Sequence, residues 1–385
     1  MQQKLIRFIK ELYSSTEFVP LHAPTFQGHE SNYVQDTIQS TFVSSVGAYV
    51  ERFERDMASY CGAAKAVAVV NGTAALQVSL YAAGVRQDDL VITQALTFVA
   101  TCNAIHWLGA EPVFVDVSER TLGLCPVALL AFLQQHCQLT EAGCVHRQSK
   151  RRIRAVVPMH TFGHPVALDE IVLICQQWQL QLVEDAAESL GSLYKNQQTG
   201  TFGRFGALSF NGNKIITTGG GGMVLCQTEA DGAALKHLTT TAKIAHRDEF
   251  VHDDYGFNFR MPNLNAALGC AQLERLAAFV TDKRATAILY QDFFAGTDYQ
   301  SVMEPDDARS NYWLNAVICP SAAAKQQLIA AAAAQDIMLR PVWRPMHQLV
   351  MYQHCLRGEL SVTEWLAGHL LNLPSSVRSH CHELR

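Results

Sequence analysis

The stretch Ala66-Val67-Ala68-Val69-Val70-Asn71-Gly72-Thr73-Ala74-Ala75-Leu76 joins a short apolar run to a helix-forming run through a single glycine. An unbroken apolar run of this length is typical of a strand that is buried on both faces of a sheet. Gly72 lets the backbone approach a ligand closely, and the first amides of the following helix point outward without partners. Such a helix start binds phosphate groups, although an ordinary helix capped by Thr73 would have the same pattern.

Short apolar runs of the same kind recur along the chain. Helix-forming stretches separate most of them, and strands that alternate with helices predict an α/β domain with a mostly parallel, seven-stranded sheet. The expected strands are Ala66–Val70, Leu90–Ile92, Pro112–Val115, Ile153–Pro158, Leu180–Glu184, Ala207–Phe210 and Met223–Cys226, and the expected helices are Thr73–Ala83, Val99–Trp107, Pro126–Gln138 and Asp169–Gln177.

The pattern changes after about residue 255. Asn263–Phe294 has the apolar spacing of one long helix or of two in sequence. Beyond it, Asn315–Cys319 resembles a strand, and Ala322–Ala334 is an alanine-rich, helix-forming run. We therefore predict a large domain over residues 1–254, which includes an N-terminal arm, and a smaller α+β domain over residues 255–385.

Composition narrows the class of protein. Apolar residues make up 49% of the 385, which is enough for a full core, and a net charge of −5 argues against a nucleic-acid partner. The 11 cysteines show no Cys-x-x-Cys spacing, so reduced thiols are expected. The first residues have the spacing of a short amphipathic helix instead of a signal peptide, and no apolar run reaches the roughly 20 residues that span a bilayer. We expect a cytoplasmic protein with no membrane partner.

Two conspicuous clusters have simple explanations. His380-Cys381-His382 has the composition of a metal site, but no second pair of ligands lies at a useful spacing, so we expect no metal. The basic run Lys150-Arg151-Arg152 directly precedes an expected strand and is interpreted as a solvated loop.

Two further stretches carry groups that suit chemistry. In Val183-Glu184-Asp185-Ala186-Ala187-Glu188, acids follow an apolar strand at the edge where α/β sheets bind ligands. A carboxylate there can hold a cationic ring nitrogen or a metal, or it can cap a solvated loop. In Ser209-Phe210-Asn211-Gly212-Asn213-Lys214, a lysine follows a strand and precedes four consecutive glycines, which a sharp turn or a nearby ligand would explain. A lysine enclosed in such a loop can form a Schiff base, whereas an exposed one would be inert.

The order of these stretches is more informative than any one of them. A phosphate-binding helix start, an acid at a strand end and a lysine 29 positions after Asp185 (214 − 185 = 29) are the parts that pyridoxal 5′-phosphate (PLP) requires. Together they resemble the DegT/DnrJ/EryC1/StrS family of sugar aminotransferases over nearly the whole chain. The resemblance rests on Gly72–Leu76, Thr97–Thr101, Glu184–Glu188, Ser209-Phe210 with Lys214, the glycine run, and Gly256–Met261.

Four other segments are most similar to one branch of that family, which aminates UDP-linked 4-keto-6-deoxy-N-acetylhexosamines on the way to legionaminic acid or bacillosamine. These segments are Val19–His22, Val43–Gly47, Arg340–Trp343 with Met346-His347, and Asn372–Ser376. The resemblance makes Ser44, Ser45, Trp343 and His347 candidates for the sugar side of the pocket. His347 could equally be a structural histidine, and His160 at a strand end could pack instead of approaching the cofactor.

The family resemblance implies an aspartate-aminotransferase-like fold (fold type I) with PLP as the cofactor. Lys214 would bind the cofactor covalently, and Asp185 would keep its ring nitrogen protonated. Asn258 would reach the cofactor phosphate of the partner subunit, which makes the expected active unit a homodimer. The remaining cofactor contacts would be stacking by Phe98, phosphate binding by Gly72, Thr73 and Ser209, and a position for Glu188 near the cofactor hydroxyl.

The implied reaction moves an amino group from L-glutamate to a nucleotide-linked keto-sugar. The alternative substrate is GDP-4-keto-6-deoxymannose, as in perosamine synthesis. A dehydratase of the same fold carries histidine in place of the cofactor lysine, so Lys214 argues against that activity. A non-catalytic PLP-binding sensor stays open, although the full set of Asp185, Ser209, Lys214 and Asn258 opposes it.

Overall fold

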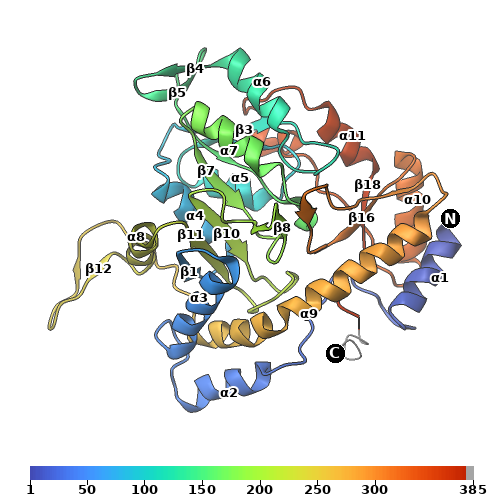
Figure 1. Ribbon diagram of the computed structural model, residues 1–385, viewed down its shortest axis with the longest axis horizontal. Coiled ribbons are helices and arrows are strands. Elements are labelled where there is room, and N and C mark those ends of the chain that lie inside the picture. The colour runs from blue at the N-terminus through green and yellow to red at the C-terminus, as the bar shows by residue number, and fades with distance from the viewer. Residues whose placement is uncertain (379–385) are drawn as a thin grey trace.

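All seven expected strands lie in one sheet of the computed structural model, which describes residues 1–378 (Figure 1). The strand order is β1-β11-β10-β7-β6-β2-β3, with β11 antiparallel to both of its neighbours and the other pairs parallel. The prediction of a mostly parallel, seven-stranded sheet is therefore confirmed. The strands are β1 Lys65–Val69, β2 Leu90–Gln94, β3 Glu111–Val115, β6 Ile153–Val157, β7 Gln181–Asp185, β10 Phe205–Ser209 and β11 Gly222–Cys226.

The side chains of each strand alternate between two faces, and both faces are buried. On β1, Val67 and Val69 enter the core beneath α4, α5 and α8, whereas Ala66 and Ala68 enter the core beneath α3 and α9. This burial on two faces is the reason that the strands are continuous apolar runs. The covering helices are α3 Ala48–Cys61, α4 Gly72–Ala82, α5 Val99–His106, α6 Pro126–His136, α7 Leu168–Gln177, α8 Glu229–Thr239 and α9 Asn263–Phe294.

A second, antiparallel sheet follows α9, which is a single helix of 32 residues. Its strand order is β14-β16-β18-β17. In the sequence, α10 lies between β16 and β17, and α11 lies between β17 and β18. The N-terminal helix α1 packs its Leu5 and Ile9 into the core of this sheet, so the first helix and the last strand, β18, belong to one core. The domain division at residues 254 and 255 stays a prediction. The bounds are α1 Gln2–Leu12, β14 Gln300–Ser301, β16 Asn315–Ile318, α10 Ala322–Ala333, β17 Arg340–Pro341, α11 Ser361–His369 and β18 Leu370–Leu373.

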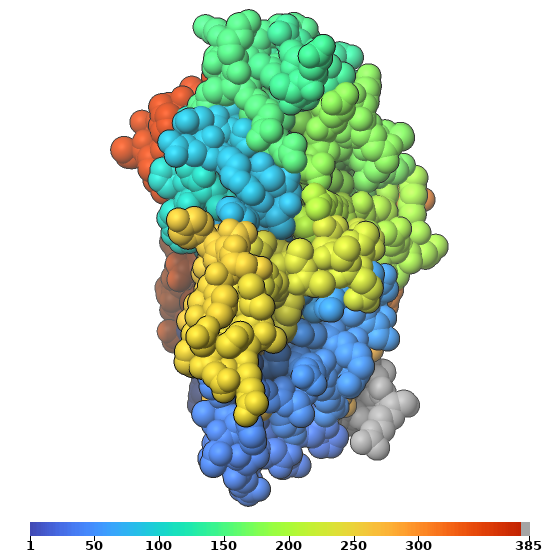
Figure 2. Space-filling model, turned by 90° about the vertical axis from the view of Figure 1, so that its left-hand side faces the viewer, coloured from blue at the N-terminus to red at the C-terminus, as the bar shows by residue number. Residues whose placement is uncertain are grey.

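Short hairpins and one more helix complete the architecture. The helix expected to reach Gln138 ends at His136, because Cys137–Thr140 pairs as β4 with β5 Gly143–His146. A second hairpin, of β12 Lys243–Ile244 and β13 Val251–His252, projects from the body of the molecule (Figure 1), and Figure 2 views the molecule from that side. The others are α2 Glu30–Gln39 and the small sheet of β15 Ala308–Arg309, β8 Leu193–Tyr194 and β9 Gln197–Gln198.

Two expectations concern the chain as a whole. Within residues 1–378, none of the helices combines the length and the hydropathy that a membrane crossing requires. The cluster His380-Cys381-His382 lies outside the described residues.

Candidate active site

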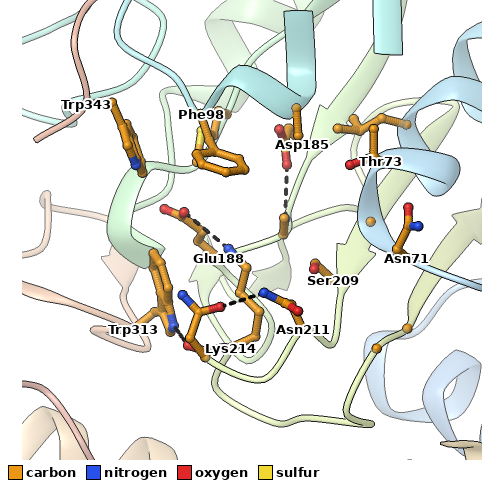
Figure 3. Close-up of a pocket in the computed structure, with 18 residues that line it drawn as sticks. Asn71, Thr73, Phe98, Asp185, Glu188, Ser209, Asn211, Lys214, Trp313 and Trp343 are labelled. Atoms are coloured by element: carbon orange, nitrogen blue, oxygen red, sulfur yellow. Dashed lines mark hydrogen bonds and ion pairs between the residues drawn. The ribbon is translucent and has the colours of Figure 1, made fainter. Parts of the chain in front are cut away.

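A pocket opens where the carboxyl ends of β7 and β10 meet the start of α4 (Figure 3). Asp185 is the last residue of β7, and Ser209 is the last residue of the neighbouring β10. This is the edge at which open α/β sheets place their ligands. Eight of the predicted site residues line the pocket: Gly72, Thr73, Phe98, Asp185, Glu188, Ser209, Lys214 and Trp343.

Asp185 forms the acidic end of the pocket. It is 3% exposed, and its carboxylate accepts hydrogen bonds from the Thr101 hydroxyl at 2.7 Å and from the Ala187 amide at 3.2 Å. Burial raises the pKa of this carboxyl, while those two donors and the charge of Lys214 act against the increase. A cationic group in the pocket would supply the missing charge partner, as a protonated pyridine nitrogen does.

The start of α4 also lines the pocket. Asn71, not Thr73, caps this helix, since the Asn71 side chain accepts from the Ala74 amide at 2.8 Å. A Cβ on Gly72 would lie 2.7 Å from the Cβ of Ser209, so only glycine allows the turn to approach the serine this closely. The first helical amides have no acceptor within the helix, and with the Ser209 hydroxyl they could hold a phosphate group.

Lys214 points into the same pocket, where its amine lies beside Glu188 and Trp313 (Figure 3). Its Nζ lies 3.3 Å from Oε1 of Glu188 and 4.1 Å from the centre of the Trp313 ring, and its side chain is 12% exposed. The other oxygen of Glu188 accepts the Phe162 amide at 2.9 Å. Burial raises the pKa of Glu188 to about 7, against the opposing effect of the lysine charge.

These groups fit PLP. The cofactor has a phosphate, a ring nitrogen and an aldehyde, and the pocket offers a partner for each. The helix start with the Ser209 hydroxyl suits the phosphate, the buried acid suits the ring nitrogen, and the lysine suits the aldehyde. Phe98, which is 47% exposed, supplies an aromatic wall beside them. The fit rests on Asp185 in particular, because a buried carboxyl with a raised pKa and an open side toward the pocket suits a cation.

Four predicted residues lie outside the pocket of their own chain. Asn258 is exposed beyond the β12–β13 hairpin and accepts from Nε of Arg260 at 3.1 Å. Ser44 and Ser45 lie in the turn before α3, outside the lining. His347 is 7% exposed, and its Nε2 lies 3.3 Å from Glu364, which favours the structural role for this histidine.

His160 also has a structural role. Its ring nitrogen Nε2 donates to Glu184 at 3.1 Å, and its Nδ1 accepts from the Val166 amide at 3.3 Å. The ring is fully buried and does not line the pocket. The histidine therefore links the segment after β6 to β7, the strand that carries Asp185, by a hydrogen bond.

Sequence reasoning missed several lining residues. Asn211 and Asn213 both precede Lys214 in the same loop, and this proximity in the sequence could have identified them as candidates. Trp313 comes from the segment before β16, about 100 residues away, where no local pattern distinguishes it from a core tryptophan. Thr101 reaches Asp185 from the first turns of α5, and it lies in a stretch already quoted for the family resemblance.

Comparison with known proteins agrees with this geometry. The profile of the DegT/DnrJ/EryC1/StrS aminotransferase family matches residues 24–383. GDP-perosamine synthase of Escherichia coli O157:H7 is 33% identical over 93% of both chains. The putative pyridoxal phosphate-dependent aminotransferase EpsN of Bacillus subtilis (strain 168) is 34% identical over 87% of this chain and 84% of its own.

The fold is also that of a known aminotransferase. The crystal structure of the aminotransferase TlmJ from Streptoalloteichus hindustanus superposes with a TM-score of 0.83, at 27% identity, over 92% of this chain and 93% of that one. This superposition confirms the predicted fold class. The chain belongs to the DegT/DnrJ/EryC1/StrS family and is a PLP-dependent aminotransferase.

Proposed function

We propose that the protein transfers an amino group from L-glutamate to the ketone of a nucleotide-linked 4-keto-6-deoxy sugar. The observation that carries this proposal is the pocket itself, which brings Lys214, the buried acid Asp185 and the start of α4 together. PLP, when bound, would carry the amino group between the two substrates and withdraw electrons from the reacting carbon.

The residues of the chain would divide the work. Asp185 would hold the ring nitrogen through a charge-assisted hydrogen bond, worth about 1.5–3 kcal/mol. Lys214 would bind the cofactor and, once its amine is free, move a proton at the reacting carbon. The other assigned roles are phosphate binding by Gly72, Thr73 and Ser209, ring stacking by Phe98, and contact of Glu188 with the cofactor hydroxyl.

Two sugars are candidates. The E. coli relative is a GDP-perosamine synthase, and its match over 93% of both chains supports GDP-4-keto-6-deoxymannose. The segments around Val19–His22 and Arg340–Trp343 support a UDP-linked 4-keto-6-deoxy-N-acetylhexosamine by their resemblance. Trp343 lines the pocket and would contact either sugar. We place the GDP sugar first, because the similarity to its synthase extends over nearly the whole chain.

The substrate proposal is tested by incubating the PLP-loaded protein with glutamate and a panel of nucleotide-linked keto-sugars, with mass spectrometry of the products. We expect an amino sugar from the GDP-linked or the UDP-linked 4-keto-6-deoxy substrate, together with 2-oxoglutarate. A cofactor band that never responds to glutamate, with no amino sugar from any substrate, would favour the non-catalytic sensor.

We also propose a homodimer with shared active sites. The β12–β13 hairpin and its flank expose large apolar side chains, with Phe250 84% and Tyr255 92% exposed, on the side viewed in Figure 2. Large apolar side chains that are this exposed on one projecting segment suit an interaction surface. Asn258 follows Tyr255 by three residues, so a partner that packs on this hairpin would lie close to Asn258.

Subunit mixing tests the shared site. Lys214→Ala and Asn258→Ala are each expected to impair activity, but a mixed dimer of the two contains one intact site. Activity recovered after unfolding and refolding the two variants together supports the proposal. Recovery no greater than the sum of the separate variants would contradict it.

A further inference from the structure

The amine of Lys214 lies between two walls that belong to different parts of the chain (Figure 3). One wall is the Glu188 carboxylate, 3.3 Å away, on the segment after β7. The other is the ring face of Trp313, whose centre lies 4.1 Å from Nζ. Both walls are nearly inaccessible to solvent, at 2% exposed for Glu188 and 4% for Trp313.

Trp313 is held on three sides. Its indole Nε1 donates to the backbone carbonyl of Asn213 at 2.7 Å, which ties the ring to the residue before Lys214. Its backbone carbonyl accepts from the buried amine of Lys283 at 3.0 Å, and its own amide donates to the side chain of Asn311 at 2.8 Å. The ring therefore cannot turn away from the lysine without breaking its bond to Asn213, while the other two bonds fix the backbone from which the ring projects.

Asn311 connects the two walls. While its Oδ1 accepts from Trp313, its Nδ2 donates to the backbone carbonyls of Glu188 and Leu190, both at 2.9 Å. The side chain is fully buried. A Cβ on Gly163 would lie 1.9 Å from Oδ1 of Asn311, and this glycine has a left-handed φ of 98°, so the backbone is shaped to make room for the asparagine.

We propose that Trp313 and Glu188 form a two-walled seat for the Lys214 amine, in which Trp313 is a positioning residue and Glu188 exchanges a proton with the amine. The inference deepens the proposed function and rests on it, because it concerns the lysine that would bind PLP. Neither wall was assigned this role from the sequence.

The two walls act on the amine in different ways. The ring face attracts an ammonium group without forming a hydrogen bond, so it holds the nitrogen in place and leaves its protons free. Glu188 can take one of those protons: an N–H bond of the ammonium breaks and an O–H bond of the carboxylic acid forms, with no other change. The amine left behind is the form that can attack a carbonyl carbon.

The test measures how fast the cofactor-free protein captures PLP, by visible absorbance and by mass spectrometry after borohydride reduction. Trp313→Leu is expected to slow capture about tenfold. Its calorimetric affinity for pyridoxamine 5′-phosphate, which cannot bond to the lysine, should stay within about twofold of wild type, because the phosphate and ring sites are intact. Trp107→Leu, which removes a tryptophan that is 59% exposed, is the matched control and should behave as wild type.

Two further variants keep the proposal falsifiable if Trp313→Leu does not fold. Trp313→Phe keeps a ring face but loses the bond to Asn213, and capture slowed about threefold is expected. In wild type the capture rate should rise with pH through about 7, the pKa of Glu188, and Glu188→Gln should lack this step.

The outcomes separate the two proposals. Wild-type capture rates in the foldable Trp313 variants, or the same pH step in Glu188→Gln, would overturn the seat and leave the proposed function standing. Equal losses of PLP capture and pyridoxamine phosphate affinity in Trp313→Leu would also overturn it, since they indicate collapse of the whole pocket. Failure of the wild-type protein to capture PLP on Lys214 would overturn both proposals.

Discussion

Glu184 and Asp185 are consecutive carboxylates at the end of β7, and because strand side chains alternate they point to opposite faces of the sheet. Glu184 is fully buried, and the protein supplies all of its hydrogen-bond partners: its carboxylate accepts hydrogen bonds from three backbone amides and from the ring of His160. Asp185 has two donors, Thr101 and Ala187, and lines the pocket. The three amides that Glu184 accepts, each at 2.7 Å, belong to Gly200, Phe202 and Gly203.

The difference shows what separates a structural acid from a ligand-binding one. Both side chains are buried and adjacent, so neither burial nor residue type distinguishes them. What distinguishes them is the number of hydrogen-bond donors that the protein supplies to each carboxylate. A buried carboxylate with four protein donors holds a loop in place, whereas one with two donors and a side that faces the pocket needs a cation. Burial raises the pKa of Asp185 accordingly.

The largest expected effect tests the structural side of the comparison. Glu184→Ala leaves three backbone amides and the His160 ring without their acceptor, so the free energy of unfolding should fall by about 3–5 kcal/mol. Glu170→Ala, which removes an exposed glutamate of α7, should change it by less than about 0.5 kcal/mol. Urea denaturation of the cofactor-free protein measures both, and equal midpoints would contradict the assignment.

Glu188, the third acid of the stretch, gives a prediction about pH. Its pKa is raised to about 7 in the folded protein, so the folded state binds the proton more tightly than the unfolded chain does. The stability from this group is full below about pH 4.5 and is lost as the pH rises through about 7. Relative to Glu188→Gln, wild type should lose about 3 kcal/mol over that window. Parallel stability–pH curves for the two proteins would show that Glu188 is not buried as described.

Asp185→Asn should affect function without affecting the fold. The amide is nearly the same size and removes a buried charge, so the cofactor-free protein should be as stable as wild type or more stable. Cofactor affinity should fall about 10- to 150-fold, which corresponds to a charge-assisted bond of 1.5–3 kcal/mol. Calorimetric titration with PLP measures the loss, and an unchanged affinity would remove Asp185 from the cofactor site.

The smallest effect concerns a donor to Asp185. Thr101→Val removes a hydroxyl that donates at 2.7 Å and replaces it with a methyl group of similar shape. Because one hydrogen bond is worth about 1 kcal/mol, cofactor affinity should fall about fivefold. The same titration applies, and a loss as large as that of Asp185→Asn would mean that Thr101 does more than support the carboxylate.

Much of the fold and of the pocket was predictable because their signals are local. Each strand is a continuous apolar run, and Gly72, Asp185 and Lys214 all follow such runs, so topology alone brings them to one edge of the sheet. The β4–β5 hairpin was missed because Pro126–His136 continues into it without a break in composition, and only pairing with Gly143–His146 makes Cys137–Thr140 a strand.

Other parts of the site depend on contacts between distant segments. Trp313 reaches Asn213 across 100 residues of sequence, and Asn311 bonds Glu188 across 123. No periodicity or motif encodes such pairings. For the same reason, Ser44, Ser45 and Asn258 could be nominated from the sequence, but the structure of one chain leaves them outside its own pocket.

The most direct test of the central claim is reduction of the PLP-loaded protein with borohydride, followed by peptide mapping. The account predicts that the cofactor is attached to Lys214. Lys283 is the informative comparison, because it is fully buried and its pKa is lowered to about 7. Its amine, however, donates hydrogen bonds to the backbone carbonyls of Trp313 and Ser375. Cofactor found on Lys283 or on surface lysines, with Lys214 unmodified, would contradict the account.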